Sequence, residues 1–390
     1  MQLLFLTFTT AYCMGVFFSI ALANVGHLGL IALLLLQLCR DRDFRRKCFD
    51  FHKTYKLWIP VVYIVLLAFV GSFRGNVPNG LSVFCKYVRM LSVLVLIPAF
   101  IGNHRLQKAF LYSFFISGTC YVLFKYLGYN SSPNIIHTSI YMSCILLYFI
   151  MKSLVTGSRK QCFIYNFLVI FATFSLFFVN REKTGALASI VAVAAVATIT
   201  KRSLSRSSIV LFTFWGILSL SICQKTELWG RLANIKGPSY THRTLMLQQA
   251  RLLIKENPLL GVGTGNYPKA LAEHNFSHLG AEGNKINPHA HPHNEWVMFC
   301  ILWGILGLAG LIGLFGYIIH HFIIRIRRNN LVGENNFYIG FAFALVIIYF
   351  VSGCCEAVFF MTLPQSAFLF WLALCFAADY EQRHGNLVKQ

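Results

Sequence analysis

The sequence VMFCILWGILGLAGLIGLFGYII, Val297 to Ile319, decides the fold class. It holds no charged side chain and is longer than the ~20 apolar residues that an α-helix needs to cross a bilayer. Similar runs recur along the chain, of which 57% is hydrophobic and only 12% charged, against about 25% charged in a soluble domain. The sequence therefore predicts an all-α polytopic membrane protein, because a transmembrane barrel would show short alternating segments instead.

These runs predict about twelve transmembrane helices. The first is expected to be a retained helix, since it has no early basic region and no clear small-residue cleavage site. Its boundary with the second is expected near Asn24, Val25 and Gly26. The predicted spans cover residues 2–21, 25–39, 57–73, 81–101, 107–127, 134–152, 161–179, 184–200, 208–223, 294–320, 337–353 and 360–379.

Basic residues in the linkers predict the orientation. One set of alternate linkers is rich in Lys and Arg, most of all residues 40–56, whereas the short linkers of the other set carry only Arg74, Arg181 and Lys183. The positive-inside rule places the first set and both termini in the cytoplasm of an inner-membrane protein. It also accounts for the net charge of +21 without a nucleic-acid partner.

One long outer linker interrupts the short ones and divides the chain. Residues 1–223 hold nine spans, residues 224–293 form a large periplasmic loop, and residues 294–390 hold the last three spans and a cytoplasmic tail. Within the loop, RTLMLQQARLLIKE (243–256) has helical periodicity, and residues 268–274 predict a second short helix. Between them, LLGVGTGNYP (259–268) is interpreted as a turn, because it follows a helix and lacks the spacing of a nucleotide fingerprint.

Three histidines stand at the start of the tenth span, in PHAHPHNEW (288–296). The spacing of His289, His291 and His293 suits a zinc site if the segment is extended, but the two prolines direct the side chains apart. The sharper hypothesis is one catalytic base, His293, whose neutral imidazole can take a proton from a hydroxyl. Asn294 and Glu295 would orient it or the substrate. A polar helix start among lipid headgroups stays open as an alternative.

Cations on the outer side predict an anionic ligand. Arg181 and Lys183 lie in a tight outer linker, where positive charge is disfavoured. Lys86 and Arg89 lie three residues apart in the outer part of the fourth span, where an ionisable side chain predicts function, although Lys86 also fits simple snorkelling. Arg243 opens the predicted loop helix, a natural anion site. Together with His293 these residues suit a lipid diphosphate and a transferase that needs no cofactor or metal.

The order of three motifs resembles a known family. PLLGVGTGNYP (258–268), HPHNEW (291–296) and WGILGL (303–308), after a loop helix with an early Arg, are similar to the O-antigen ligase and polymerase superfamily. The similarity is sharpest over residues 239–312, and the arrangement of spans and loop looks most like that of the lipopolysaccharide O-antigen ligases. The resemblance implies a GT-C-like fold and periplasmic transfer of a glycan from undecaprenyl diphosphate to lipid A–core, inverting and metal-independent.

The resemblance also implies residue roles. His293 would be the general base and Arg243 a diphosphate ligand, with His289 and His291 as supporting residues in the loop. The family has a basic residue before Thr-Gly ahead of the eighth span; Lys183 occupies that position here, and Arg181 is the alternative ligand. Since Lys lacks the bidentate fork of Arg, this position departs from the pattern. Lys86 and Arg89 match no family motif and are assigned from their location alone.

Two other functions remain open at this point. An O-antigen polymerase or a protein O-oligosaccharyltransferase would use the same donor with a different acceptor. A second large outer loop would favour the polymerase, and an appended periplasmic domain would favour some protein-glycosylating relatives. A lipid or polysaccharide transporter would show internal repeats or charges deep in several spans. Any active-site cavity is expected to open toward the outer leaflet, because the polyprenyl tail is too apolar to leave the bilayer.

Overall fold

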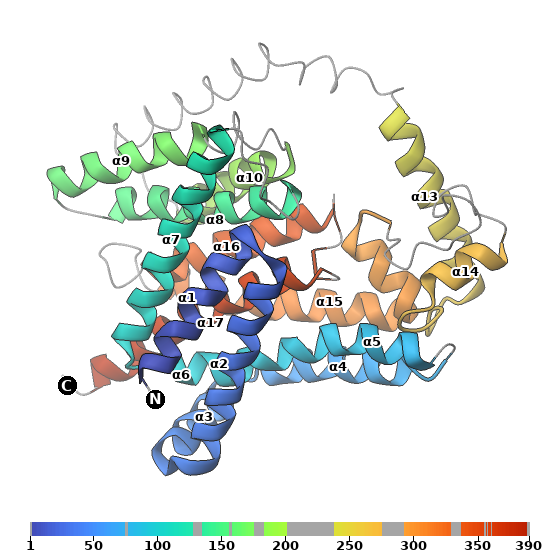
Figure 1. Ribbon diagram of the computed structural model, residues 1–390, viewed down its shortest axis with the longest axis horizontal. Coiled ribbons are helices and arrows are strands. Elements are labelled where there is room, and N and C mark those ends of the chain that lie inside the picture. Colours follow the sequence, from blue (N-terminus) through green and yellow to red (C-terminus); the bar gives the residue numbers. More distant parts are fainter. Residues whose placement is uncertain are drawn as a thin grey trace.

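The described part of the chain is built from α-helices and one short 3-10 helix, η1, without strands. The computed structural model describes residues 2–74, 77–127, 135–155, 158–174, 183–200, 238–274, 292–328 and 337–387, except residues 355, 357 and 360. Figure 1 shows α13 and α14 together at one end of the molecule, away from the C-terminus. The elements are α1 (Gln2–Phe18), α2 (Ile20–Arg40), α3 (Arg42–Thr54), α4 (Trp58–Gly71), α5 (Val77–Val88), η1 (Arg89–Leu91), α6 (Ser92–Phe100), α7 (His104–Tyr126), α8 (Ile135–Val155), α9 (Arg159–Phe174), α10 (Lys183–Thr200), α13 (Pro238–Glu256), α14 (Tyr267–Glu273), α15 (Glu295–Arg328), α16 (Phe337–Gly353) and α17 (Thr362–Leu387).

The all-helical prediction is confirmed for these residues, whereas the number of spans stays a prediction. A helix overlaps every predicted span except 208–223, which lies outside the described residues. Among the described residues, four helical stretches are long and apolar enough to cross a membrane. There are five if α3 and α4, which are bent by 93°, count as one broken span. α1 and α16 are apolar but shorter. The four stretches are Ile20–Arg40, Val77–Phe100, Glu295–Arg327 and Leu363–His384.

The first two helices meet at a different residue from the one predicted. The break is at Ser19, whose extended backbone and hydroxyl cap α2 by accepting from Leu22 N at 3.4 Å. Gly26 lies inside α2, where a Cβ would stand 2.3 Å from Tyr12 N on α1. The glycine therefore permits close helix packing, as small residues do between membrane helices, and does not end the helix.

The basic linker 40–56 forms a helix of its own. Asp41 Oδ1 caps α3 by accepting from the backbone N–H groups of Asp43 and Phe44, at 2.9 and 3.1 Å. Phe44 and Phe51 face the core, whereas the three arginines and Lys53 are exposed. Such an amphipathic, Lys- and Arg-rich helix is typical of one that lies along a membrane surface.

The tenth predicted span is one helix with a break inside it. α15 leaves helical geometry at Trp303 (φ −135°, ψ 16°) and Gly304 (φ 61°, ψ −149°). The glycine-rich turn supplies the hydrogen bonds that the break removes: Val262 N donates to Ile301 O at 2.8 Å and Gly263 N donates to Leu302 O at 2.9 Å. The PLLGVGTGNYP and WG motifs are therefore two halves of one backbone interaction, and the predicted turn is confirmed.

Thr264 fixes this turn to α4 as well. Its hydroxyl donates to Ala68 O at 2.7 Å, and its backbone N–H donates to Gly71 O at 3.1 Å. The buried Trp303 indole N–H in turn donates to Thr264 Oγ1 at 2.9 Å. Every buried polar atom in this chain of contacts has a partner, which holds the turn rigidly against both helices. The turn is thus a structural joint, and no phosphate-binding role follows from its glycines.

We expect Gly304→Ala to unfold the protein or lower its free energy of unfolding by at least about 3 kcal/mol. The backbone of Gly304 has a conformation that only glycine adopts readily, and a Cβ there would stand 2.3 Å from Leu259 C. Gly313→Ala is the matched control, because a Cβ at Gly313, on the same helix, meets nothing within 4 Å. Thermal unfolding in detergent measures both, and equal midpoints would contradict this account of the break.

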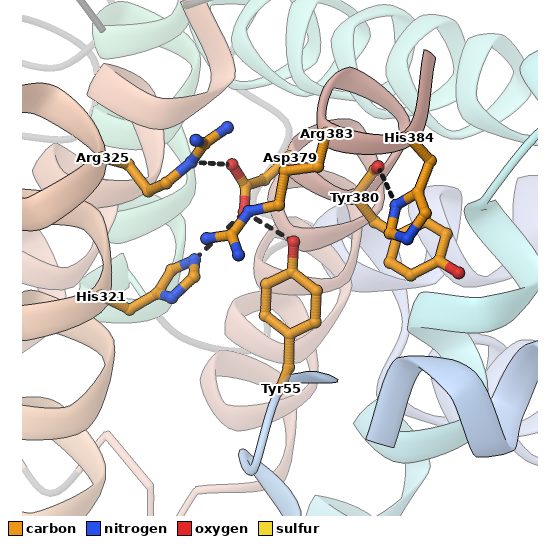
Figure 2. Close-up of polar contacts among 7 residues, drawn as sticks. All are labelled: Tyr55, His321, Arg325, Asp379, Tyr380, Arg383 and His384. Carbon is orange, nitrogen blue, oxygen red and sulfur yellow. Dashed lines mark hydrogen bonds and ion pairs between the residues drawn. The ribbon is translucent and has the colours of Figure 1, made fainter. Parts of the chain in front are cut away.

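A buried carboxylate joins three parts of the fold near the end of α17. Asp379 accepts hydrogen bonds from Tyr55 Oη at 2.7 Å and from Arg325 Nε, while His321 Nε2 lies 3.1 Å and Arg383 Nε 3.3 Å from it (Figure 2). Tyr55 precedes α4, and the histidine and one arginine lie on α15. A buried charge is tolerated only with such partners. The cluster connects the end of α3 with α15 and α17, and no sequence motif predicted it.

Candidate functional site

The imidazole of His293 contacts a buried carboxylate that lies 63 residues later in the chain. His293 Nδ1 lies 3.0 Å from both Oε1 and Oε2 of Glu356. The histidine precedes α15, and the glutamate follows α16, where its backbone N–H donates to Ser352 O at 2.9 Å. Because an ionised carboxylate only accepts hydrogen bonds, Nδ1 carries the proton and Nε2 is the nitrogen that can take one up.

Exposure differs sharply between the two partners. The Glu356 side chain is 1% exposed and the His293 side chain is 33% exposed. A substrate can therefore reach the imidazole but not the carboxylate behind it. This arrangement of a base held by an inner acid is the one found where a histidine removes a proton from a hydroxyl.

The backbone of His293 is held in an unusual conformation. Its φ of +50° makes it the one non-glycine residue with positive φ among the described residues. This region is sparsely populated by side chains other than Asn, Asp and His, and such conformations cluster at functional sites. The side chain is directed at Glu356 by this turn between Pro292 and the helix that follows.

Asn294 and Glu295 bind the same connection that carries Glu356. Asn294 Oδ1 caps α15 by accepting from Val297 N at 3.0 Å, and its Nδ2 donates to Cys354 O at 2.9 Å. Glu295 is buried, and its Oε2 accepts from Phe359 N at 2.6 Å. These two residues hold the segment after α16 against the start of α15.

Trp296 completes the attachment by packing. Its ring lies 4.6 Å from that of Phe350 on α16 and 5.6 Å from that of Phe315 on α15. Gly353 lets α16 approach the start of α15 closely, since a Cβ there would stand 3.3 Å from Glu295 Cβ. Each residue of the His-Asn-Glu-Trp motif thus has a distinct contact, and all of them join α15 to the end of α16.

Lys86 lies on α5 and Arg89 begins η1, on either side of a tyrosine that contacts the first half of α15. Tyr87, between them, has its ring 4.8 Å from that of Trp303 and 6.1 Å from that of Phe299. Both cations are half-buried, and Arg89 Nη1 donates to Asn24 Oδ1 on α2 at 2.8 Å. Arg89 therefore has a structural partner, which offsets the cost of its burial.

The remaining predicted residues are described only in part. Lys183 begins α10 and Arg243 lies within α13, but both side chains lie outside what the structure describes. α13 begins at Pro238, so Arg243 is in its second turn and does not open the helix, as the sequence analysis predicted. Arg181, His289 and His291 lie outside the described residues altogether.

The part of the chain that the structure describes holds no candidate metal cluster. Among the described residues, no three His, Cys, Asp or Glu side chains lie close enough to hold a metal ion. The zinc hypothesis for His289, His291 and His293 is not tested, since two of them lie outside those residues. Burial raises the pKa of Tyr267, on α14, to about 12, so its phenol stays protonated near neutral pH.

A comparison with protein families shows which family part of the chain resembles. Residues 145–312 match the family model described as O-Antigen ligase. This segment belongs to the O-antigen ligase superfamily. The family covers O-antigen ligases and related polymerases. No curated protein matches the chain significantly.

The family segment runs from α8 into the first half of α15. It contains Lys183, Arg243 and His293 together with both halves of the joint between the glycine-rich turn and the break at Gly304. The match of residues 145–312 to this family, together with several long apolar helices among the described residues, indicates a multi-pass membrane protein.

Glu356 lies beyond the matched segment, and the sequence analysis missed it. One feature of the sequence pointed to Glu356. The chain has only 13 acidic residues, and Glu356 falls in the linker between the predicted eleventh and twelfth spans. The predicted orientation places that linker on the same side as His293. An acid there was a candidate partner for the histidine.

Proposed function

We propose that the protein is an O-antigen ligase, a glycosyltransferase of the bacterial inner membrane whose active site faces the periplasm. It would move an O-antigen glycan from undecaprenyl diphosphate to a hydroxyl of lipid A–core. The contact between His293 and the buried Glu356 carries this proposal, because it supplies an accessible base held by an acid. Membership of residues 145–312 in the O-antigen ligase superfamily supports the choice of substrates.

The proposed reaction is a single displacement. Nε2 of His293 takes the proton from the acceptor hydroxyl as its oxygen attacks the anomeric carbon of the glycan. The bond from that carbon to the diphosphate oxygen breaks, and undecaprenyl diphosphate leaves with the electron pair, so the configuration at the carbon inverts. Glu356 stabilises the imidazolium that forms. The proton is then lost to water.

Cations are needed on the leaving group. The departing diphosphate gains negative charge, which positively charged side chains stabilise without a metal ion. We assign this role to Arg243 and to Arg181 or Lys183, with Lys86 and Arg89 as further candidates. Their side of the membrane, predicted from the basic linkers, is that of the large loop 224–293. Transfer is expected to persist in excess chelator, and loss restored by zinc would instead support the three-histidine site.

Analysis of lipopolysaccharide from a deletion strain tests the proposed function. A ligase predicts a core without any O-antigen and accumulation of the lipid-linked polymer. A polymerase predicts a core that bears one repeat unit. Unaltered lipopolysaccharide with loss of glycan from a periplasmic protein would indicate a protein O-oligosaccharyltransferase. Either of these two patterns would overturn the ligase.

We expect Arg243→Ala to lower kcat/KM for the lipid-linked donor by about 100-fold, the cost of removing one charge-stabilising donor. Arg243→Lys should restore only part of the lost kcat/KM, because lysine lacks the bidentate fork of arginine. Arg251→Ala is the control, since Arg251 is an exposed arginine two turns later on α13. Steady-state transfer with varied donor in detergent measures the effect. If both alanine variants behave alike, the diphosphate assignment fails.

A further inference from the structure

A large cavity lies between helices that the proposed reaction does not use. It has a volume of about 720 Å³ and is lined by residues of α7, α8, α9 and the start of α16. Figure 1 labels these four helices. Along α7 it runs from His104 to Cys120, a distance of about 24 Å at 1.5 Å per residue. This is more than half of the ~30 Å hydrocarbon core of a bilayer.

One end of the cavity is cationic. His104 and Lys108 lie in the first turns of α7, and Lys152 lies in the last turn of α8. Lys108 is exposed, and Lys152 Nζ stands 4.6 Å from the centre of the Phe337 ring. The predicted orientation places these helix ends at the cytoplasmic surface, because they border the basic linkers.

The rest of the cavity is apolar. Beyond its cationic end most of its lining is aliphatic or aromatic, with Thr119 and Cys120 at the far end, and none of the described residues that line it is acidic. Glu381 contacts one of the lining residues: its carboxylate accepts from Gln107 Nε2 at 2.9 Å and from Gly102 N at 2.6 Å. Its carboxylate is therefore engaged in the junction between α6 and α7. The apolar lining includes Phe115, Ile116, Met142, Ile145, Phe149 and Phe171.

We propose that this cavity binds an anionic glycerophospholipid of the cytoplasmic leaflet. Lys108 and Lys152 hold its phosphate, and one acyl chain lies along α7 toward Cys120. Basic pockets between membrane helices on the cytoplasmic side recognise anionic headgroups in this way. The apolar length matches an acyl chain, and the two cations match one phosphate. The lipid-linked donor is assigned to the opposite end of the molecule, so this site is separate from the reaction.

Lipid retention by the purified protein tests the site. Native mass spectrometry after extraction is expected to show phosphatidylglycerol bound in preference to phosphatidylethanolamine. The variant Lys108→Ala/Lys152→Ala is expected to weaken phosphatidylglycerol binding about thirtyfold, which corresponds to about 1 kcal/mol for each cation. Arg46→Ala/Lys53→Ala is the matched control, because it removes two exposed cations from α3, outside the cavity.

A second variant tests the acyl-chain path without changing charge. Cys120→Trp fills the apolar end of the cavity and is expected to lower phosphatidylglycerol retention while leaving the cationic end intact. Equal retention by wild type and the double lysine variant would overturn the proposal. So would equal binding of the two phospholipids, or displacement of phosphatidylglycerol by a stoichiometric amount of polyprenyl phosphate.

Discussion

Replacing His293 by Asn is expected to lower the rate of glycan transfer by about 10³-fold, the usual contribution of a positioned general base. Asparagine is the informative substitution, because it tolerates the left-handed backbone that His293 adopts at φ +50°. The fold around Asn294 and Trp296 is therefore expected to persist while the proton acceptor is lost. Transfer from a lipid-linked donor to lipid A–core in detergent measures the loss.

His274→Ala is the matched control for this experiment. His274 follows α14 and its Nε2 lies 3.0 Å from Glu256 Oε2, so it is a histidine of the same loop with its own carboxylate partner. Its removal is expected to leave transfer within about twofold of wild type, since surface ion pairs contribute little. If His293→Asn retained near-native transfer in a folded preparation, the base would have to be another group.

The sequence predicts where the helices are better than where they end. Apolar content alone indicates α15, α16 and α17, because a long run without charge has few other structures open to it. The boundary between α1 and α2 was wrong since Gly26 looks like a local break. It is in fact a contact with Tyr12 on the preceding helix, which only the packed structure reveals.

The break inside α15 could not be predicted from its own residues. The run from Val297 to Ile319 is uniformly apolar, and a glycine such as Gly304 occurs in many continuous membrane helices. What permits the break is a set of backbone donors from Val262 and Gly263, which stand about forty residues earlier. Hydrogen bonds of this kind between distant segments carry no local signal in the sequence, so nothing in either motif indicates that the two form one joint.

In the candidate site, too, one residue is evident from its local sequence and its distant partner is not. His293 is evident from its position at the start of a span, whereas Glu356 is separated from it by 63 residues and by the whole of α15 and α16. Arg243 was predicted from its place in the loop helix, and that helix begins earlier than expected, at Pro238. Side-chain chemistry near one motif can be inferred from sequence, but the partner that α16 carries back to it cannot.

Glu356→Ala is expected to lower kcat by about 10²–10³-fold while KM for the donor stays unchanged, because Glu356 acts through His293 and does not contact the glycan. Its carboxylate is 1% exposed and lies 3.0 Å from Nδ1, so its loss frees the imidazole to rotate and removes the charge that stabilises the protonated ring. The kcat of Glu356→Gln should lie between those of wild type and Glu356→Ala, since an amide oxygen can still accept from Nδ1 without carrying charge.

A merely structural role for Glu356 predicts a different pattern. The segment after α16 is also held by Asn294 and Glu295, through Cys354 O and Phe359 N. The folded fraction of Glu356→Ala, isolated by size exclusion, should therefore remain large and its slow turnover should persist. If that fraction instead turned over like wild type, Glu356 would serve only packing. If KM for the donor rose as kcat fell, it would have to contact substrate, and the assignment of His293 as a base held from behind would be wrong.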